Sequence, residues 1–149
     1  MKIKLKKLFI YIFITFLIGS LFINNTDLYN NINKAINLPS FIFPVIWSIL
    51  YLLMGLSVYI ISESKDINKN DAIKAYFIQL VVTSLWTLFF FGFRFYVLSF
   101  IWILLLICLV IIMILKFYKI NKLAGLLNIP YLFWLIFASY LSFSIIILN

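Results

Sequence analysis

Residues 95–115 read FYVLSFIWILLLICLVIIMIL, which is 21 consecutive residues without a charged side chain. An α-helix rises about 1.5 Å per residue and the apolar core of a bilayer is about 30 Å thick, so about 20 such residues cross it. Backbone groups in that core find no water, and a helix satisfies nearly all of them internally. The stretch therefore predicts a membrane-spanning helix.

Four more charge-free stretches of 19 to 28 residues accompany it, at residues 8–26, 35–62, 75–93 and 123–149. They are too long for the strands of an outer-membrane barrel, which are about ten residues of alternating hydrophobicity. With 66% hydrophobic residues, the chain also lacks the polar residues that a water-facing surface needs. We predict an all-α integral membrane protein, a five-transmembrane-helix bundle. It would form a single domain over 1–149, with helices near residues 7–24, 41–62, 72–92, 96–117 and 124–148.

The basic side chains are distributed unevenly between the predicted connections. Ten of the 12 Lys and Arg residues precede the first crossing or lie in the second and fourth connections, whereas Lys34 and Arg94 fall on the other side. The positive-inside rule then places the N-terminus in the cytoplasm and the C-terminus outside, and we expect a bacterial cell membrane. The net charge of +8 is thus interpreted as a topology signal and a source of lipid headgroup contacts. Because the loops carry no stacking platform, we predict no nucleic-acid binding.

The residue types missing from the predicted helices also restrict the function. The four acidic residues all fall in connections, and the chain has no histidine. Pumps and proton-coupled transporters use ionisable groups inside the membrane, and histidine is the usual catalytic base and metal ligand. The composition therefore argues against ion-driven transport, a conventional hydrolase or a metalloenzyme, and predicts no metal site and no required cofactor. Cys108, in the middle of a crossing, is expected to be a small buried apolar side chain.

Rings and polar side chains recur at helical spacing in three of the predicted helices. Such faces could converge on an apolar pocket with a few hydrogen-bonding groups, which would suit a flat hydrophobic ligand. The alternative is ordinary packing, with small residues such as Ala138 and Ser142 allowing helices to approach. The polar segment at residues 24–37 is either a solvated loop or a lid, with Leu28 and Tyr29 as its candidate contacts. The candidate ligand-binding residues are Trp47, Tyr51, Gln79, Thr83, Trp86, Phe90, Trp134, Ala138, Leu141 and Ser142.

At these residues the chain resembles the tryptophan-rich sensory protein and translocator family (TspO/MBR), which includes the peripheral-type benzodiazepine receptor. Residues 38–55 (LPSFIFPVIWSILYLLMG) resemble the family's proline-containing FPVVWTxLYxLMG segment, and residues 79–92 (QLVVTSLWTLFFFG) resemble QLxLNxxWSxLFFG. Residues 117–149 are similar to FYxIxxxAGxLxxPYLxWVxFAxYLNxxIxxLN. Thr83 and Ser142 stand where the family has asparagines, which weakens hydrogen bonding to a ligand oxygen.

The resemblance implies a five-helix bundle that forms a homodimer and binds porphyrins or other flat hydrophobic molecules, with the first connection as a lid. The leading hypothesis is a membrane receptor or carrier for a tetrapyrrole-like ligand, acting in tetrapyrrole regulation or stress sensing. A second is light-dependent porphyrin degradation, in which Trp47 and Trp134 would donate electrons to the excited ligand. A third is a structural subunit of a larger membrane complex. A haem-like ligand would be held by ring stacking rather than by histidine ligation.

Overall fold

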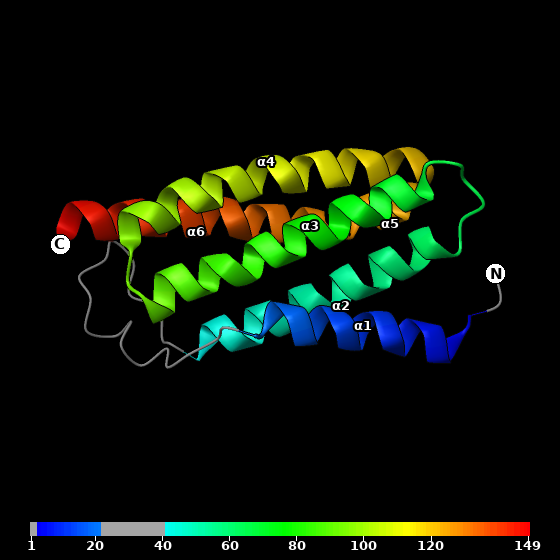
Figure 1. Cartoon of the computed structure of the whole chain (residues 1–149), viewed down its shortest axis with the longest axis horizontal. Helices are drawn as coiled ribbons and strands as arrows, with labels where there is room; N and C mark the ends of the chain where they lie inside the picture. The colour runs from blue at the N-terminus through cyan, green and yellow to red at the C-terminus, as the bar shows by residue number, and fades with distance from the viewer. Residues whose placement is uncertain (1–2, 22–40) are drawn as a thin grey trace.

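The computed structural model describes residues 3–21 and 41–149, and these residues form a helical bundle (Figure 1). The predicted all-α class is thereby confirmed. The helices are α1 (Leu5–Gly19), α2 (Ile42–Ser62), α3 (Lys69–Thr87), α4 (Tyr96–Ile120), α5 (Lys122–Leu126) and α6 (Ile129–Leu148), and a π-helical turn, η2 (Leu88–Gly92), extends α3.

The long helices lie side by side along one axis of the molecule (Figure 1). α1 packs on α2 and α3, α3 packs on α4, and α5 lies against α2 and α4. The α6 backbone runs close to α4, whereas it stays beyond close backbone contact with α2 and α3 over most of its length. Large side chains therefore fill the space between α6 and the α2–α3 pair.

The two ends of the bundle differ in charge. One end carries the start of α1, the α2–α3 connection and the α4–α5 connection, and it contains every described charged side chain except Arg94; we call it the charged end. The opposite end carries the start of α2, the turn between η2 and α4, and the C-terminal end of α6 (Figure 1). A charge-free interior between two such ends is what a bilayer requires.

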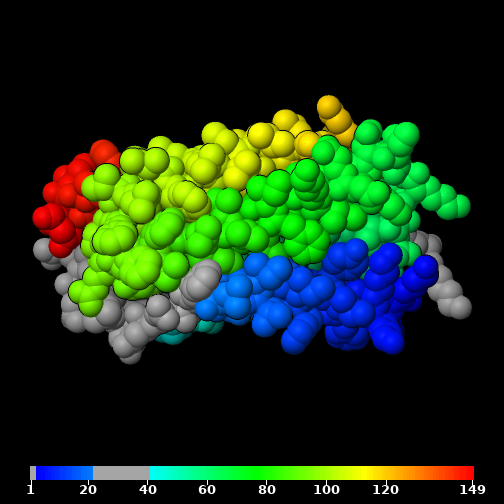
Figure 2. Space-filling model, in the orientation of Figure 1, coloured from blue at the N-terminus to red at the C-terminus, as the bar shows by residue number. Residues whose placement is uncertain are grey.

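Four helical segments among the described residues are long and apolar enough to cross a membrane: Ile42–Ser62, Lys69–Gly92, Tyr96–Ile120 and Lys122–Leu148. The 15-residue α1 packs beside α2. Large apolar side chains such as Phe13 and Phe133 remain exposed on the outside of the bundle, as expected for a surface in contact with lipid. Figure 2 shows one such outer face, formed by α1, α3 and α4. Cys108 also lies on the outer surface, so the expectation that it is buried was wrong.

The helix bounds differ from the predicted ones in two informative places. α1 ends at Gly19 rather than near residue 24, and the Gly19 carbonyl accepts a hydrogen bond of 2.9 Å from the Tyr51 hydroxyl. The predicted last helix is divided into α5 and α6, because Pro130 at the start of α6 has no N–H and its ring would clash with the carbonyl four residues earlier. Residues 22–24 of the predicted first helix lie outside the described residues.

A close helix contact holds α1 against α2. A Cβ atom on Gly55 would lie 2.8 Å from the Ile12 Cα atom, so only glycine permits this approach. α1 is also bonded to α3, through the Thr15 and Tyr76 hydroxyls and through the Ser84 hydroxyl, which donates to the Ile18 carbonyl. These contacts hold α1 against α2 and α3, and α2 and α3 carry much of the candidate site.

Candidate functional site

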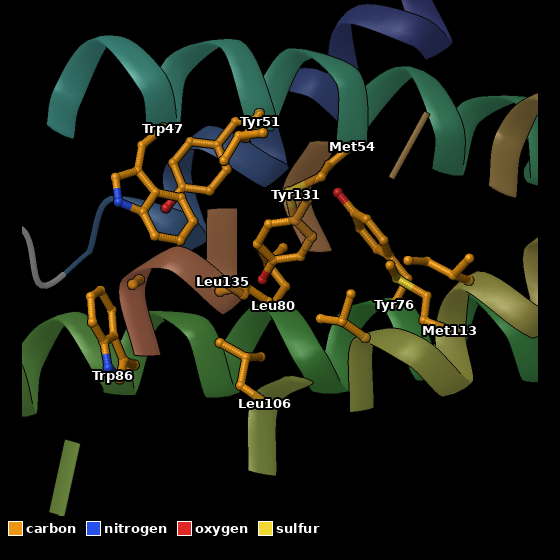
Figure 3. Close-up of a cluster of buried hydrophobic side chains, with 14 of the residues drawn as sticks. Trp47, Tyr51, Met54, Tyr76, Leu80, Trp86, Leu106, Met113, Tyr131 and Leu135 are labelled. Carbon is orange, nitrogen blue, oxygen red and sulfur yellow. The ribbon is translucent and has the colours of Figure 1, made fainter. Parts of the chain in front are cut away.

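Aromatic side chains from α2, α3, η2 and α6 gather inside the bundle. We call this group the ring cluster; it consists of Phe43, Trp47, Tyr51, Trp86, Phe90, Phe91, Tyr131 and Trp134. Figure 3 shows Trp47 and Tyr51 extending from α2 toward α3, Trp86 on α3, and Tyr131 between the two helices. The rings thus fill the space between the α6 backbone and the α2–α3 pair.

Trp47 is the centre of this cluster. Its ring centroid lies 5.5 Å from that of Tyr51, 6.3 Å from that of Trp86 and 6.1 Å from that of Tyr131. Trp86 stacks on Phe90 with a centroid separation of 5.0 Å. Trp47 and Trp86 are only 3% and 2% exposed. Faces from three helices, which the sequence shows only separately, therefore meet at one place.

Trp134 joins the cluster at its margin. It is half-buried, and its ring lies 5.9 Å from that of Phe43, which in turn lies 5.7 Å from that of Phe91. Phe91 makes an edge contact with Trp86 at 6.2 Å. Trp134 and Trp47 are thus connected through intermediate rings.

A hydrogen-bonded group lies against the rings. The Tyr131 hydroxyl donates to Gln79 Oε1 at 2.9 Å and lies 2.5 Å from the Thr83 hydroxyl. Thr83 also donates to the carbonyl of Gln79 at 2.9 Å. All three residues are buried, so α3 and α6 are joined by polar contacts shielded from solvent, where such bonds are strong.

Several buried donors in the ring cluster, and one on Gln79 beside it, have no acceptor among the described residues. The indole nitrogens of Trp47, Trp86 and Trp134 and the Nε2 atom of Gln79 have no hydrogen-bond partner among the described residues. A buried donor without a partner costs about 1–3 kcal/mol, and native proteins keep few of them. Trp102 differs, because its indole N–H donates to the Val82 carbonyl at 2.9 Å. The unused donors are therefore concentrated in the ring cluster.

The other predicted site residues are placed as follows. Ala138, Leu141 and Ser142 are buried on α6, where the Ser142 hydroxyl donates to the carbonyl of Ala138 in its own helix at 2.9 Å. A role for these three in ligand contact stays a prediction. Leu28 and Tyr29, the predicted lid contacts, lie outside the described residues.

Tyr131 and Phe43 were not among the predicted ligand-binding residues. Tyr131 is fully buried and contacts both the rings and the polar group. A signal for it exists in the sequence, since it precedes Trp134 by three positions and shares its helix face. Phe43 precedes Trp47 by four positions and could have been found in the same way.

The rings fill the space that they enclose. Centroid separations of 4.8 to 6.3 Å are those of rings in direct contact. A ligand that reaches the unused donors must therefore move some of these side chains apart. The backbones of α6 and the α2–α3 pair lie apart over most of their length, so such movement there meets few close backbone contacts.

These features define a membrane protein of several helical spans with an aromatic, donor-rich interior. The sequence matches the TspO/MBR family over residues 8–148. The chain belongs to this family.

Individual relatives support the assignment. The chain is 35% identical to the tryptophan-rich protein TspO of Chlorobaculum tepidum, with 76% of this chain and 73% of that protein covered. It is 37% identical to the tryptophan-rich protein TspO of Archaeoglobus fulgidus, with coverage of 74% and 72%. It is 31% identical to the tryptophan-rich sensory protein of Cereibacter sphaeroides, with coverage of 81% and 76%.

Proposed function

We propose that this protein is a membrane receptor or carrier that binds a flat, largely apolar molecule of the tetrapyrrole class between α2, α3 and α6. The observation that carries the proposal is the set of unused donors inside the ring cluster. Rings supply stacking surface for a planar ligand, and the indole and amide N–H groups supply orientation. Since the chain has no histidine, the ligand is held without imidazole ligation of a metal.

Binding of protoporphyrin IX tests this proposal directly. The full chain in phosphatidylcholine nanodiscs is titrated with protoporphyrin, and the Soret band reports the bound fraction without relying on tryptophan emission. We expect Trp47→Phe and Trp86→Phe each to weaken binding about three- to tenfold, since each loses a donor and part of a ring.

Trp102→Phe is the matched control for these variants. Trp102 is half-buried outside the cluster, and its N–H already has an acceptor. We expect this variant to bind protoporphyrin as the unmodified protein does. Equal affinity of Trp47→Phe, Trp86→Phe and Trp102→Phe would show that the ring cluster is not the binding site.

Native mass spectrometry of protein extracted from its own cells distinguishes a ligand-binding protein from a structural subunit. We expect a homodimer that retains a small molecule with the mass of a tetrapyrrole or a similar planar compound. Recovery only in a complex with other chains, without a retained small molecule, would favour the structural alternative.

A further inference from the structure

The unused polar atoms of the ring cluster and of Gln79 beside it are all of one kind. Three are indole N–H groups and the fourth is the amide nitrogen of Gln79. Each of these groups donates and none accepts. The site therefore complements a ligand that presents acceptor atoms, such as carbonyl or carboxylate oxygens.

The charged side chain at the end of the bundle opposite the charged end also favours a ligand with acceptor atoms. Arg94 is the one charged side chain that the described residues place at the end opposite the charged end, and it pairs with no carboxylate of the described chain. The described acids Glu63, Asp66 and Asp71 all lie at the charged end. Because Arg94 has no acidic partner among the described residues, its guanidinium can pair with the anionic group of a bound molecule.

The backbone holds Arg94 in a defined turn. Arg94 has φ of 55°, in the left-handed region that non-glycine residues seldom occupy. The turn is closed by hydrogen bonds from the Phe95 N–H to the Phe89 carbonyl at 2.9 Å and from the Tyr96 N–H to the Arg94 carbonyl at 3.0 Å. Arg94 is thus presented from a fixed turn rather than from a free loop.

This turn lies next to the ring cluster. The Tyr96 ring contacts Phe90 with a centroid separation of 5.6 Å, and Phe90 stacks on Trp86. Trp86 in turn contacts Trp47, so a continuous row of rings leads from the turn to the unused donors. The long side chain of Arg94 starts at one end of this row.

We infer that Arg94 forms an ion pair with a carboxylate of the ligand, so that the site selects planar apolar molecules that carry an acidic group at one edge. The inference rests on the proposed function and names the class of ligand for the same site. The guanidinium can bind a carboxylate through two parallel hydrogen bonds, while the apolar body of the ligand lies among the rings. Arg94 would thus be a specificity-determining residue.

The test compares protoporphyrin IX, which has two carboxylates, with its dimethyl ester, which has none. Both are titrated against the unmodified protein, Arg94→Asn and Arg94→Lys in phosphatidylcholine nanodiscs, whose lipid has no net charge to compete. Asparagine tolerates the left-handed backbone, so Arg94→Asn removes the charge and preserves the turn. Lys119→Asn, an exposed site at the charged end, is the matched control.

We expect Arg94→Asn to weaken binding of the diacid about fivefold and to leave binding of the ester unchanged. Arg94→Lys should retain most of the affinity, and added salt should weaken diacid binding in the unmodified protein more than in Arg94→Asn. An equal effect of Arg94→Asn on both compounds, or no effect on either, would overturn the inference while the proposed function stands. Failure of the unmodified protein to bind either compound would overturn the proposed function and this inference together.

Discussion

The two halves of the bundle interior treat their polar groups differently. Toward the charged end, the Tyr76 hydroxyl bonds Thr15, and Asn128 Nδ2 donates to the Ser57 hydroxyl at 3.0 Å. The buried atom of Asn128 without a partner in the described part of the chain is its acceptor, Oδ1, so the buried donors of these residues are all used. In the ring cluster, by contrast, the indole nitrogens of Trp47 and Trp86 are buried without an acceptor among the described residues. Hydrogen bonds join helices in both halves, as from Tyr131 to Gln79, but the unpartnered indole N–H groups lie only in the ring cluster among the described residues, and the proposed function assigns them to a bound molecule. If the proposed function is correct, variants in the two halves should affect stability and binding differently.

The largest expected effect is a loss of stability caused by separating α1 from α2 at Gly55. In Gly55→Leu, the new side chain meets the Ile12 backbone, so α1 must separate from α2. We expect a loss of about 3 kcal/mol in the free energy of unfolding or a failure to fold, because overpacking against backbone cannot relax. Thermal unfolding in detergent measures it. Leu52→Phe, which adds volume on the exposed face of the same helix, should change stability little.

A variant in the ring cluster should affect binding more than stability. Trp134→Phe removes an unused N–H and part of a half-buried ring. We expect the free energy of protoporphyrin binding to weaken by about 0.5–1.5 kcal/mol, which is about two- to twelvefold in affinity, while the thermal midpoint changes little. A large loss of stability with unchanged affinity would place Trp134 among the structural residues instead.

The complementary variant in the other half is Tyr76→Phe. It removes only the hydroxyl that bonds Thr15, between α1 and α3. We expect about 1 kcal/mol lower stability and unchanged protoporphyrin affinity. If affinity falls as much as it does in Trp134→Phe, the proposed separation between the two halves is incorrect.

The smallest expected effect is a pH-dependent change in stability that arises from the Lys7–Glu63 pair at the charged end. Lys7 Nζ lies 2.6 Å from Glu63 Oε1, and this hydrogen bond lowers the pKa of the Glu63 carboxyl below its ordinary value and raises the pKa of Lys7. The stability contributed by Glu63 is therefore present above the ordinary carboxyl pKa and is lost as the pH falls through the lowered value. The contribution of Lys7 is present below the ordinary lysine pKa and is lost as the pH rises through the raised value.

Thermal unfolding as a function of pH checks this expectation. In Glu63→Gln the decline on the acid side should be smaller than in the unmodified protein, and protoporphyrin affinity at neutral pH should be unchanged. Asp71→Asn is the control, because Asp71 is 63% exposed and its pair with Lys116 is largely screened by water. An equal change in both variants would show that Glu63 has no special role at this end.

Much of the fold follows from local features of the sequence. Charge-free stretches predict the helices, because in a bilayer each segment must satisfy its own backbone groups. The residues predicted to share an inward-facing side of α2 and of α3 do face inward, since Trp47, Tyr51, Gln79, Thr83 and Trp86 are all buried. The break before α6 was missed, although Pro130 marks it, because the apolar character continues across the break. The π-helical turn that ends α3 has no comparable signal in residues 88–92.

The sequence by itself determined the membrane class, the approximate positions of the long helices, and which residue types face inward, because these depend on hydrophobicity and spacing within one segment. The tertiary structure alone decided which inward polar groups find partners. Tyr131 meets Gln79 across 52 positions of the chain, while the indole N–H of Trp47 has no acceptor among the described residues. Whether a buried donor has an acceptor depends on atoms from other helices, and no pattern within one helix contains that information.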